Sequence, residues 1–261
     1  DDGSTDKTHD IIKQFNDFRI KYYKNEFNIG LIKTLNIGVK LANGEYILRI
    51  DADDICTPRR LEYQIEFMKR HPSYIASGGC AKIINGEKIN FLNWNVPLET
   101  IKCKTYSLFG NPFIHSTIII DRKRFQDKNL LYSSEFKHAE DYALWFGMLH
   151  NDIEMGNSSE VLTYYRIHEN NISITAEENI HERIEVLKRI NFETLKKYSD
   201  KINSDIYLSH YIFSNFDRNL KISFKNFNSL ISYYNSLISN PLFKNNYSTI
   251  YFKLIVTYFA V

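Results

Sequence analysis

The side chains best suited to chemistry form an acidic cluster, Asp51-Ala52-Asp53-Asp54, which directly follows the apolar run 45–50. Carboxylate oxygens are the ligands that hard cations such as Mg2+ or Mn2+ prefer. A divalent ion bound there could offset the charge of a diphosphate and help it to depart as a leaving group. An acidic surface turn without a ligand is the alternative, and the cluster alone does not decide between the two.

A calcium-binding helix–loop–helix also places acids at this spacing. Its template would use Asp51, Asp53 and, at the twelfth position, Glu62. The fifth and sixth positions are Ile55 and Cys56, whereas the loop needs a polar ligand and then a glycine. A strand is also expected before the cluster rather than a helix. We therefore reject the calcium loop.

Two further carboxylates open the chain, where Asp1-Asp2 precede Gly3-Ser4 and a helical pattern. Glycine permits close approach of a ligand, and a carboxylate in this place can accept a hydrogen bond from a nucleobase N–H or a ribose hydroxyl. Capping of the following helix is the simpler interpretation for part of this group.

A third group of acids, Glu140-Asp141, begins the amphipathic segment 140–149. A partly desolvated carboxylate at the edge of a pocket can deprotonate a hydroxyl group and so act as a general base. An acidic first turn also complements the helix dipole, and on its own this second interpretation would be preferred.

Arg166 and His168 follow the apolar run 161–166 and could grip a phosphate or complete the shell of a metal. A single histidine is more often structural. His115-Ser116 gives a Ser/His hydrolase little support, because no acid is placed to orient the imidazole.

Helical and strand patterns alternate up to about residue 175, which predicts an α/β sheet with helical crossovers. Ligands of such sheets bind beyond the carboxyl ends of the strands, where both Asp1-Asp2 and the 51–54 cluster are expected. The residues from 176 onward read as a separate helical region. Helices are expected at 4–18, 31–42, 59–70, 140–149 and from 180, and strands at 21–23, 45–50, 116–120 and 161–166, with a hairpin at 74–92 around Asn85-Gly86.

Composition limits the class of protein. The net charge of +2 over 261 residues does not suggest nucleic acid as a partner, and no run reaches the roughly 20 apolar residues that span a bilayer. Three widely spaced cysteines form no metal or disulfide pattern, which favours a cytoplasmic protein. From Lys201 onward there are six Lys or Arg residues against two acids, so this region could contact an anionic membrane surface peripherally.

Taken together and in order, these motifs resemble those of bacterial family 2 glycosyltransferases of the GT-A fold, over about residues 1–175. The matching stretches are Asp1-Asp2-Gly3-Ser4-Thr5-Asp6, Asn28-Ile29-Gly30-Leu31, Leu35-Asn36-Ile37-Gly38, Gly44-Glu45-Tyr46-Ile47, Arg49-Ile50-Asp51-Ala52-Asp53-Asp54, Pro58-Arg59-Arg60-Leu61-Glu62, Asn111-Pro112-Phe113-Ile114-His115-Ser116, Glu140-Asp141-Tyr142-Ala143-Leu144-Trp145 and Tyr165-Arg166-Ile167-His168.

The resemblance implies a GT-A, Rossmann-like mixed sheet flanked by helices. It also implies inverting transfer of a hexose or N-acetylhexosamine from a nucleotide sugar, expected to be a UDP-sugar, to a glycan or lipid-linked acceptor. It implies a role in lipopolysaccharide, lipooligosaccharide or capsule synthesis, at the inner face of the cytoplasmic membrane. Carried over by position, Asp141 is the expected catalytic base with Glu140 beside it. Donor contacts are expected at Asp1, Asp2, Gly30, Asp51 and Arg166, and a Mn2+ or Mg2+ site at Asp53, Asp51 and His168.

Members of this family carry a first strand and helix before the Asp-Asp-Gly-Ser turn, and this sequence opens on that turn. We therefore expect an N-terminal truncation. A sugar nucleotidyltransferase and a non-catalytic module that binds nucleotides or glycans are the rival interpretations.

Overall fold

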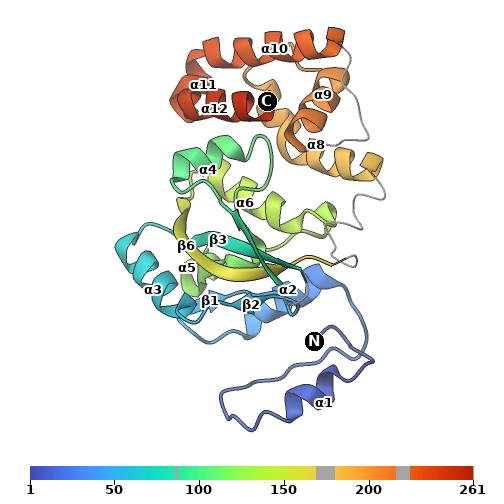
Figure 1. Ribbon diagram of the computed structural model, residues 1–261, viewed down its shortest axis with the longest axis vertical. Helices are drawn as coiled ribbons and strands as arrows, with labels where there is room; N and C mark the ends of the chain where they lie inside the picture. The colour runs from blue at the N-terminus through green and yellow to red at the C-terminus, as the bar shows by residue number, and fades with distance from the viewer. Residues whose placement is uncertain (86–87, 169–179, 216–223, 261) are drawn as a thin grey trace.

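The computed structural model describes residues 1–85, 88–168, 180–215 and 224–260, and its centre is a six-stranded mixed sheet (Figure 1). The order is β1-β5-β3-β6-β2, with β4 paired to the outer part of β3. The β3–β6 pair is parallel and the other pairs are antiparallel. The strands are β1 (Tyr46–Leu48), β2 (Ile55–Cys56), β3 (Ala76–Asn85), β4 (Lys88–Trp94), β5 (Ile119–Asp121) and β6 (Met155–Arg166).

Helices pack around this sheet and bury its apolar side chains. They are α2 (Leu31–Leu41), α3 (Arg60–Arg70), α4 (Thr100–Tyr106), α5 (Arg122–Asp127) and α6 (Glu140–His150). Trp145 of α6 and Phe125 of α5 are fully buried against Ile118 and Met155 of the sheet region. Removal of such side chains from water is the main free-energy gain that fixes helix against sheet. The expected mixed sheet flanked by helices is confirmed.

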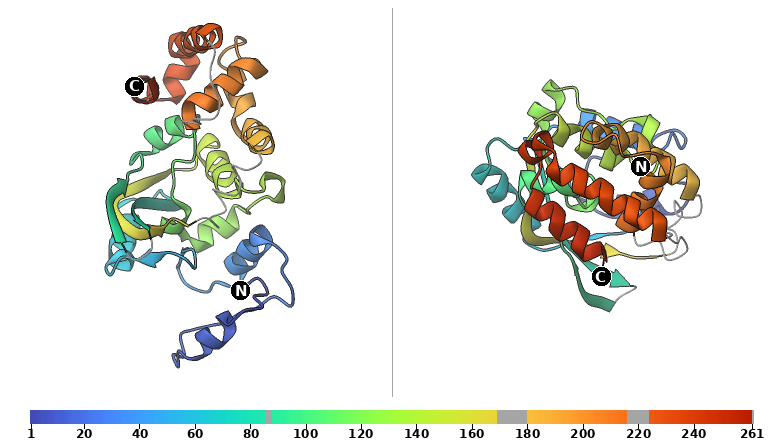
Figure 2. Two further views of the ribbon diagram at one scale, coloured as in Figure 1. Left: turned by 45° about the vertical axis from the view of Figure 1, so that its right-hand side comes forward. Right: turned by 90° about the horizontal axis from the view of Figure 1, so that it is seen from above.

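The helices after residue 180 stack beyond α4 and α6, at the opposite end of the molecule from the N-terminus (Figures 1 and 2). They are α8 (Ile180–Lys196), α9 (Ser204–Asn215), α10 (Phe224–Ser239), α11 (Pro241–Asn246) and α12 (Thr249–Ala260). This confirms the expected helical region. Within the parts of the chain that the structure describes, no helix is long and apolar enough to cross a membrane.

These helices share one apolar core with the sheet-bearing region. Leu108, Phe109, Tyr142 and Phe146 belong to the same buried cluster as Tyr207, Tyr233, Leu237 and Phe252 of the C-terminal helices. The boundary expected at 175 falls outside the described residues, and the proposed division into two domains stays a prediction.

A buried polar network crosses the same contact. The Asn191 amide donates to the Leu108 carbonyl at 3.2 Å and to the Tyr142 hydroxyl at 3.2 Å, and its oxygen accepts from the Tyr207 hydroxyl at 2.7 Å. Asn191 is 3% exposed, so each of these bonds replaces water that the buried groups have lost. His210 Nε2 also lies 2.8 Å from the Leu108 carbonyl oxygen.

The N-terminal segment differs from expectation. Helix α1 covers only Thr8–Lys13 rather than 4–18, and no residue of it is buried. Phe15 and Phe18 are 65% and 87% exposed, because this segment extends away from the sheet and has no apolar surface to pack on (Figure 1). Residues 21–23 form no strand, since their pairing with the opening residues is limited to the bonds from Asp1 N to Tyr23 O and from Asn25 N to Asp1 O.

Other boundaries were also wrong in part. The strand expected at 116–120 begins as a 3-10 turn at His115–Thr117, because the Thr117 hydroxyl and amide both donate to the Ile114 carbonyl. The expected helix at 31–42 is confirmed as α2, yet Val39 is its only buried residue. The hairpin is confirmed as β3 and β4, whereas Gly86 of its turn lies outside the described residues.

Candidate active site

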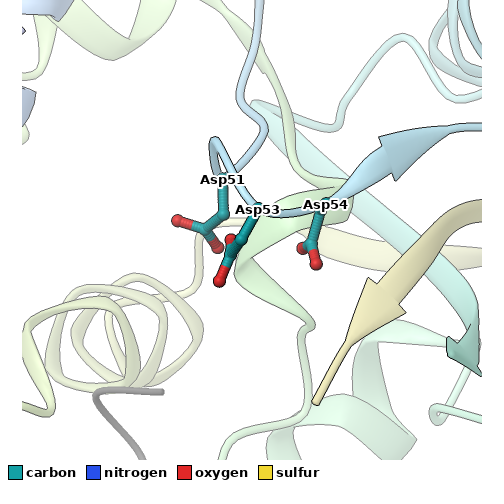
Figure 3. Close-up of side chains that lie close together, drawn as sticks. All are labelled: Asp51, Asp53 and Asp54. Atoms are coloured by element: carbon teal, nitrogen blue, oxygen red, sulfur yellow. The ribbon is translucent and has the colours of Figure 1, made fainter. Parts of the chain in front are cut away.

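The acidic cluster forms a tight turn between β1 and β2, at the edge of the sheet (Figure 3). One carboxylate oxygen from each of Asp51, Asp53 and Asp54 lies within 4.8 Å of the others. The turn is closed by a hydrogen bond from Asp54 N to Asp51 O at 3.2 Å. Three like charges at this separation repel one another, so the surrounding groups must hold the turn in place.

Asp51 is held from two sides. The Arg49 guanidinium donates to both of its carboxylate oxygens, and the Ser116 hydroxyl donates to Oδ2 at 2.7 Å. The Asp51 amide in turn donates to the same hydroxyl at 3.1 Å. The pairing of a planar guanidinium with two carboxylate oxygens fixes direction as well as distance.

Asp53 and Asp54 are contacted by the end of β6. His168 Nε2 lies 2.8 Å from Asp53 Oδ2, while the Arg166 side chain donates to the Asp53 carbonyl at 2.8 Å. The Arg166 amide donates to Asp54 Oδ1 at 2.8 Å, and Oδ2 of the same carboxyl is buried without a protein partner. Burial raises the pKa of Asp54.

A buried guanidinium lies behind the turn. Arg60 is 2% exposed; it donates to the Arg49 carbonyl at 2.6 Å, to Thr163 Oγ1 at 3.2 Å and to Gln64 Oε1 at 2.7 Å. Gln64 in turn donates to the Thr117 carbonyl at 2.6 Å. Arg60 and Gln64 of α3 therefore hold the end of β1, strand β6 and the 3-10 turn His115–Thr117 in fixed positions relative to one another.

Glu140 and Asp141 lie in the same pocket as Asp51. This pocket of about 370 Å3 also includes Arg49 and Asn111 among its lining residues. It places the first turn of α6 opposite the acidic turn, although the two are separated by almost ninety residues of sequence. Asp51 of the acidic cluster and the Glu140-Asp141 pair therefore line one pocket.

Both carboxyls in this pocket are less acidic than usual. Burial, with the neighbouring Asp141 charge as the second cause, raises the pKa of Glu140 to about 7. Burial also raises the pKa of Asp141, although Asn111 Nδ2 donates to its Oδ2 at 2.7 Å and the Tyr142 amide to its Oδ1 at 2.7 Å. A raised pKa makes the ionised form of a carboxyl a better proton acceptor.

Asp1 and Asp2 line a separate pocket of about 820 Å3, which reaches Ala52 of the acidic turn. Asp2 accepts from Ile29 N, Gly30 N and the Asn25 amide at 2.9–3.0 Å, and the Tyr22 hydroxyl donates to Asp1. Burial alone would raise the pKa of Asp2, but these hydrogen bonds outweigh it and lower the pKa. Asp2 therefore shapes the loop 25–30 around the pocket.

The residues present suit a divalent cation. Carboxylates from Asp51, Asp53 and Asp54 form a donor set that fits Mg2+ or Mn2+, and the imidazole of His168 lies beside it, 2.8 Å from Asp53 Oδ2. The unpartnered buried oxygen of Asp54 is an acceptor that the protein leaves unsatisfied. Of the expected metal ligands, Asp51 and Asp53 lie together with Asp54, and His168 contacts Asp53; their binding of a metal stays a prediction.

The structure also identifies residues that sequence reasoning did not single out. Ser116 and Asn111 orient the two groups of carboxylates, and Arg60 holds the frame behind them. All three lie inside the motif stretches, but only the folded chain shows what they contact. The pocket is also lined by Trp94 of β4, Phe109 of the loop after α4 and Leu187 of α8. No local sequence pattern predicts that these three residues line a pocket.

Comparison with known proteins places the chain in context. The family model for glycosyl transferase family 2 matches residues 1–132. WfaP of Escherichia coli, a UDP-Glc:alpha-D-GlcNAc-diphosphoundecaprenol beta-1,3-glucosyltransferase, is 30% identical over 205 residues that cover 74% of each chain. A glycosyltransferase of Haemophilus influenzae is 31% identical over 215 residues, which are 78% of this chain and 65% of that protein. The chain thus spans just under two thirds of that relative's length.

Solved structures agree on the fold. The crystal structure of S. aureus TarS 1-349 in complex with UDP-GlcNAc matches with a TM-score of 0.62 at 20% identity, covering 99% of this chain and 78% of that chain. The mannosyltransferase PcManGT from Pyrobaculum calidifontis, in complex with GDP-Man and Mn2+, matches with a TM-score of 0.53 at 10% identity, covering 100% of this chain and 75% of that chain. On the match to more than half of its length and on the identity to WfaP, the chain belongs to glycosyl transferase family 2.

Proposed function

We propose that the protein is an inverting glycosyltransferase that moves a hexosyl or N-acetylhexosaminyl group from a UDP-sugar to a glycan or lipid-linked acceptor of a bacterial surface polysaccharide. The observation that carries this is the convergence of Asp51 with Glu140 and Asp141 in one pocket, beside a second pocket lined by Asp1 and Asp2. The names of the relatives support the donor and acceptor classes, since WfaP and WfgD use UDP-Glc and a diphosphoundecaprenol-linked acceptor.

In the proposed reaction the acceptor hydroxyl gives its proton to Asp141 as its oxygen bonds to the anomeric carbon. The bond from that carbon to the diphosphate oxygen breaks, and attack from the opposite face inverts the configuration. Asn111 orients the Asp141 carboxylate through its 2.7 Å hydrogen bond. Its raised pKa suits Asp141 to accept the proton.

Asp53, Asp51 and His168 would hold a divalent cation, with Asp54 beside them. Such an ion supplies positive charge that stabilises a departing diphosphate. Arg166, which anchors the turn through the Asp53 carbonyl, carries a further positive charge toward the same end of β6. Asp1 and Asp2 would line the nucleoside pocket, and the Gly30 amide would hold the Asp2 carboxylate in place.

Three matched variants test this proposal: Asp141→Asn, Asp53→Asn and the control Asp152→Asn. Asp141→Asn is expected to lower the turnover number by about 10^2 to 10^4-fold, as loss of a general base does. Its affinity for UDP in the presence of Mn2+ should stay unchanged. Asp53→Asn should instead weaken Mn2+-dependent UDP binding, measured by calorimetry. Asp152, whose side chain is 90% exposed and lines neither pocket, should tolerate the change in both assays.

The same assays separate the rival functions. Unchanged transfer by Asp141→Asn would show that another group accepts the proton. UDP binding by the wild type without any sugar transfer, across donors and acceptors, would favour a non-catalytic module.

We also propose that the C-terminal helices contact the cytoplasmic face of the membrane. Leu242, Ile250 and Leu254 of α11 and α12 are 60–76% exposed, and Lys244 lies near them in sequence. The protein should then sediment with anionic vesicles at low salt and be released at high salt. No sedimentation at low salt would contradict this.

A further inference from the structure

The pocket that holds Asp141 combines two kinds of lining. Arg49, Asp51, Asn111 and Glu140 offer charges and hydrogen bonds, while a large part of the remaining wall is aromatic or aliphatic. That apolar wall contains Leu31, Trp94, Tyr106, Phe109, Phe113, Tyr165 and Leu187. A ligand that fits must therefore present both an apolar face and a polar edge.

Trp94 is the most distinctive part of this wall. The chain has two tryptophans; Trp145 is fully buried in the core, whereas Trp94 is 42% exposed at the pocket. Trp94 lies at the end of β4 and Tyr165 near the end of β6, and both strands pair with β3. The two rings meet edge to face, with centroids 5.2 Å apart and planes at 87°.

This edge-to-face contact restrains the indole before any ligand arrives. Edge-to-face pairs are a favoured aromatic arrangement, and a restrained ring loses less side-chain entropy on binding. Phe109, held among the C-terminal helices by its ring contact with His210 at 5.2 Å, and Leu187 of α8 also line the pocket. The C-terminal region therefore contributes to this wall directly.

We infer that Trp94 and Tyr165, with Phe109 and Leu187, form a subsite for a pyranose ring of the acceptor. This inference rests on the proposed function. The axial C–H groups of a pyranose pack on the electron-rich face of an indole, while its hydroxyls reach carboxylates and amides. An alkyl chain would displace water from the polar side of the pocket without offering hydrogen bonds in its place, which is unfavourable. The larger pocket beside Asp1 and Asp2 has the room that a nucleoside needs.

The position of the subsite selects the acceptor over the donor. Trp94 and Tyr165 line the same pocket as Asp141 and do not line the pocket of Asp1 and Asp2. A ring stacked there brings its hydroxyl edge toward the proposed base. Trp94 would thus act in binding, and Asp141 in proton transfer.

Intrinsic fluorescence provides the test, because the fully buried Trp145 serves as a constant reference. The probes are methyl glycopyranosides of glucose, galactose, mannose and N-acetylglucosamine, titrated with UDP and Mn2+ present. At least one should shift or quench the wild-type emission saturably, and Trp94→Phe should abolish this change. By calorimetry, Trp94→Phe should keep the affinity for that glycoside within about 3-fold, whereas Trp94→Ala should weaken it about 10-fold or more.

Controls separate this inference from the proposed function. Phe18→Ala removes an aromatic ring that is 87% exposed on the N-terminal segment, and it should leave glycoside affinity unchanged. UDP affinity should be the same in the wild type and Trp94→Ala. No saturable change with any glycoside, an equal response to 1,6-hexanediol, or an effect of Trp94→Ala on UDP affinity alone would overturn the acceptor subsite. Failure of the wild type to bind UDP would instead overturn the proposed function.

Discussion

At the scale of single residues, burial sets the chemistry of the site more than sequence motif does. Glu140 is 6% exposed and lies beside Asp141, so its charged form is disfavoured and its pKa rises to about 7. The sequence shows two adjacent acids at a helix start, an arrangement that surface helices also have. What makes them a candidate acid–base pair is the pocket around them, which no local pattern reveals.

Glu140 should therefore make the protein less stable as the pH rises. An acid whose pKa is raised by folding is protonated in both states below about pH 4.5, and its cost appears as the pH rises to about 7. Glu140→Gln should then unfold in urea like the wild type at pH 4.5, yet be more stable by about 3 kcal/mol at pH 8. The exposed Glu154→Gln should show no such pH-dependent gain. An equal stability difference at both pH values would contradict the assignment.

At the scale of elements, long periodic segments were predictable and short ones were not. Helices α2, α3 and α6 follow from apolar periodicity and turn residues. The two-residue strand β2 was missed because it exists only through its pairing with Tyr164 and Thr163 of β6. The helix expected at 4–18 was too long because amphipathic spacing holds a helix only where another surface covers it.

The start of α2 carries a backbone requirement that can be tested. Gly30 has φ of +93° and donates to Asp2, whereas Gly38 lies inside the helix; an added Cβ would meet no atom within 4 Å at either position. Gly30→Ala should cost about 1–3 kcal/mol through backbone strain alone. Gly38→Ala should stabilise the protein by about 0.5–1 kcal/mol, because alanine is the better helix former.

Thermal unfolding of the two variants measures this difference. Gly30→Ala should also raise the KM for the nucleotide sugar, since the Gly30 amide donates to Asp2, which lines the pocket. Equal stabilities for the two alanine variants would show that the left-handed conformation of Gly30 is not required.

At the scale of the whole molecule, the C-terminal helices pack against the first turn of α6, the helix that carries Glu140 and Asp141. Asn191 of α8 donates to the hydroxyl of Tyr142, the residue that follows Asp141. The sequence could predict that a helical region follows residue 175. It could not predict this contact, because the partners are 49 residues apart and the network exists only once both are buried.

Replacement of Asn191 by Leu should destabilise the protein by about 1–3 kcal/mol, because the Tyr207 hydroxyl loses its acceptor in a buried place. The turnover number should fall as well, since the first turn of α6 loses a restraint. Asn235→Leu, on an exposed position of α10, should stay within about 0.5 kcal/mol of the wild type. Urea unfolding and initial-rate measurements check both. A stable Asn191→Leu protein with normal turnover would show that the network is dispensable.

The shared core has a consequence for recombining this enzyme with its relatives. A crossover placed between the sheet and the C-terminal helices would separate Leu108 and Phe109 from the aromatic side chains that enclose them. It would also divide the donor of the Tyr142 hydrogen bond from its acceptor. A chimaera that keeps this core intact therefore has to inherit α4, the loop after it, α6 and α8–α12 from one parent. To exchange acceptor preference as well, it has to take Trp94 of β4 and Tyr165 of β6 from that same parent.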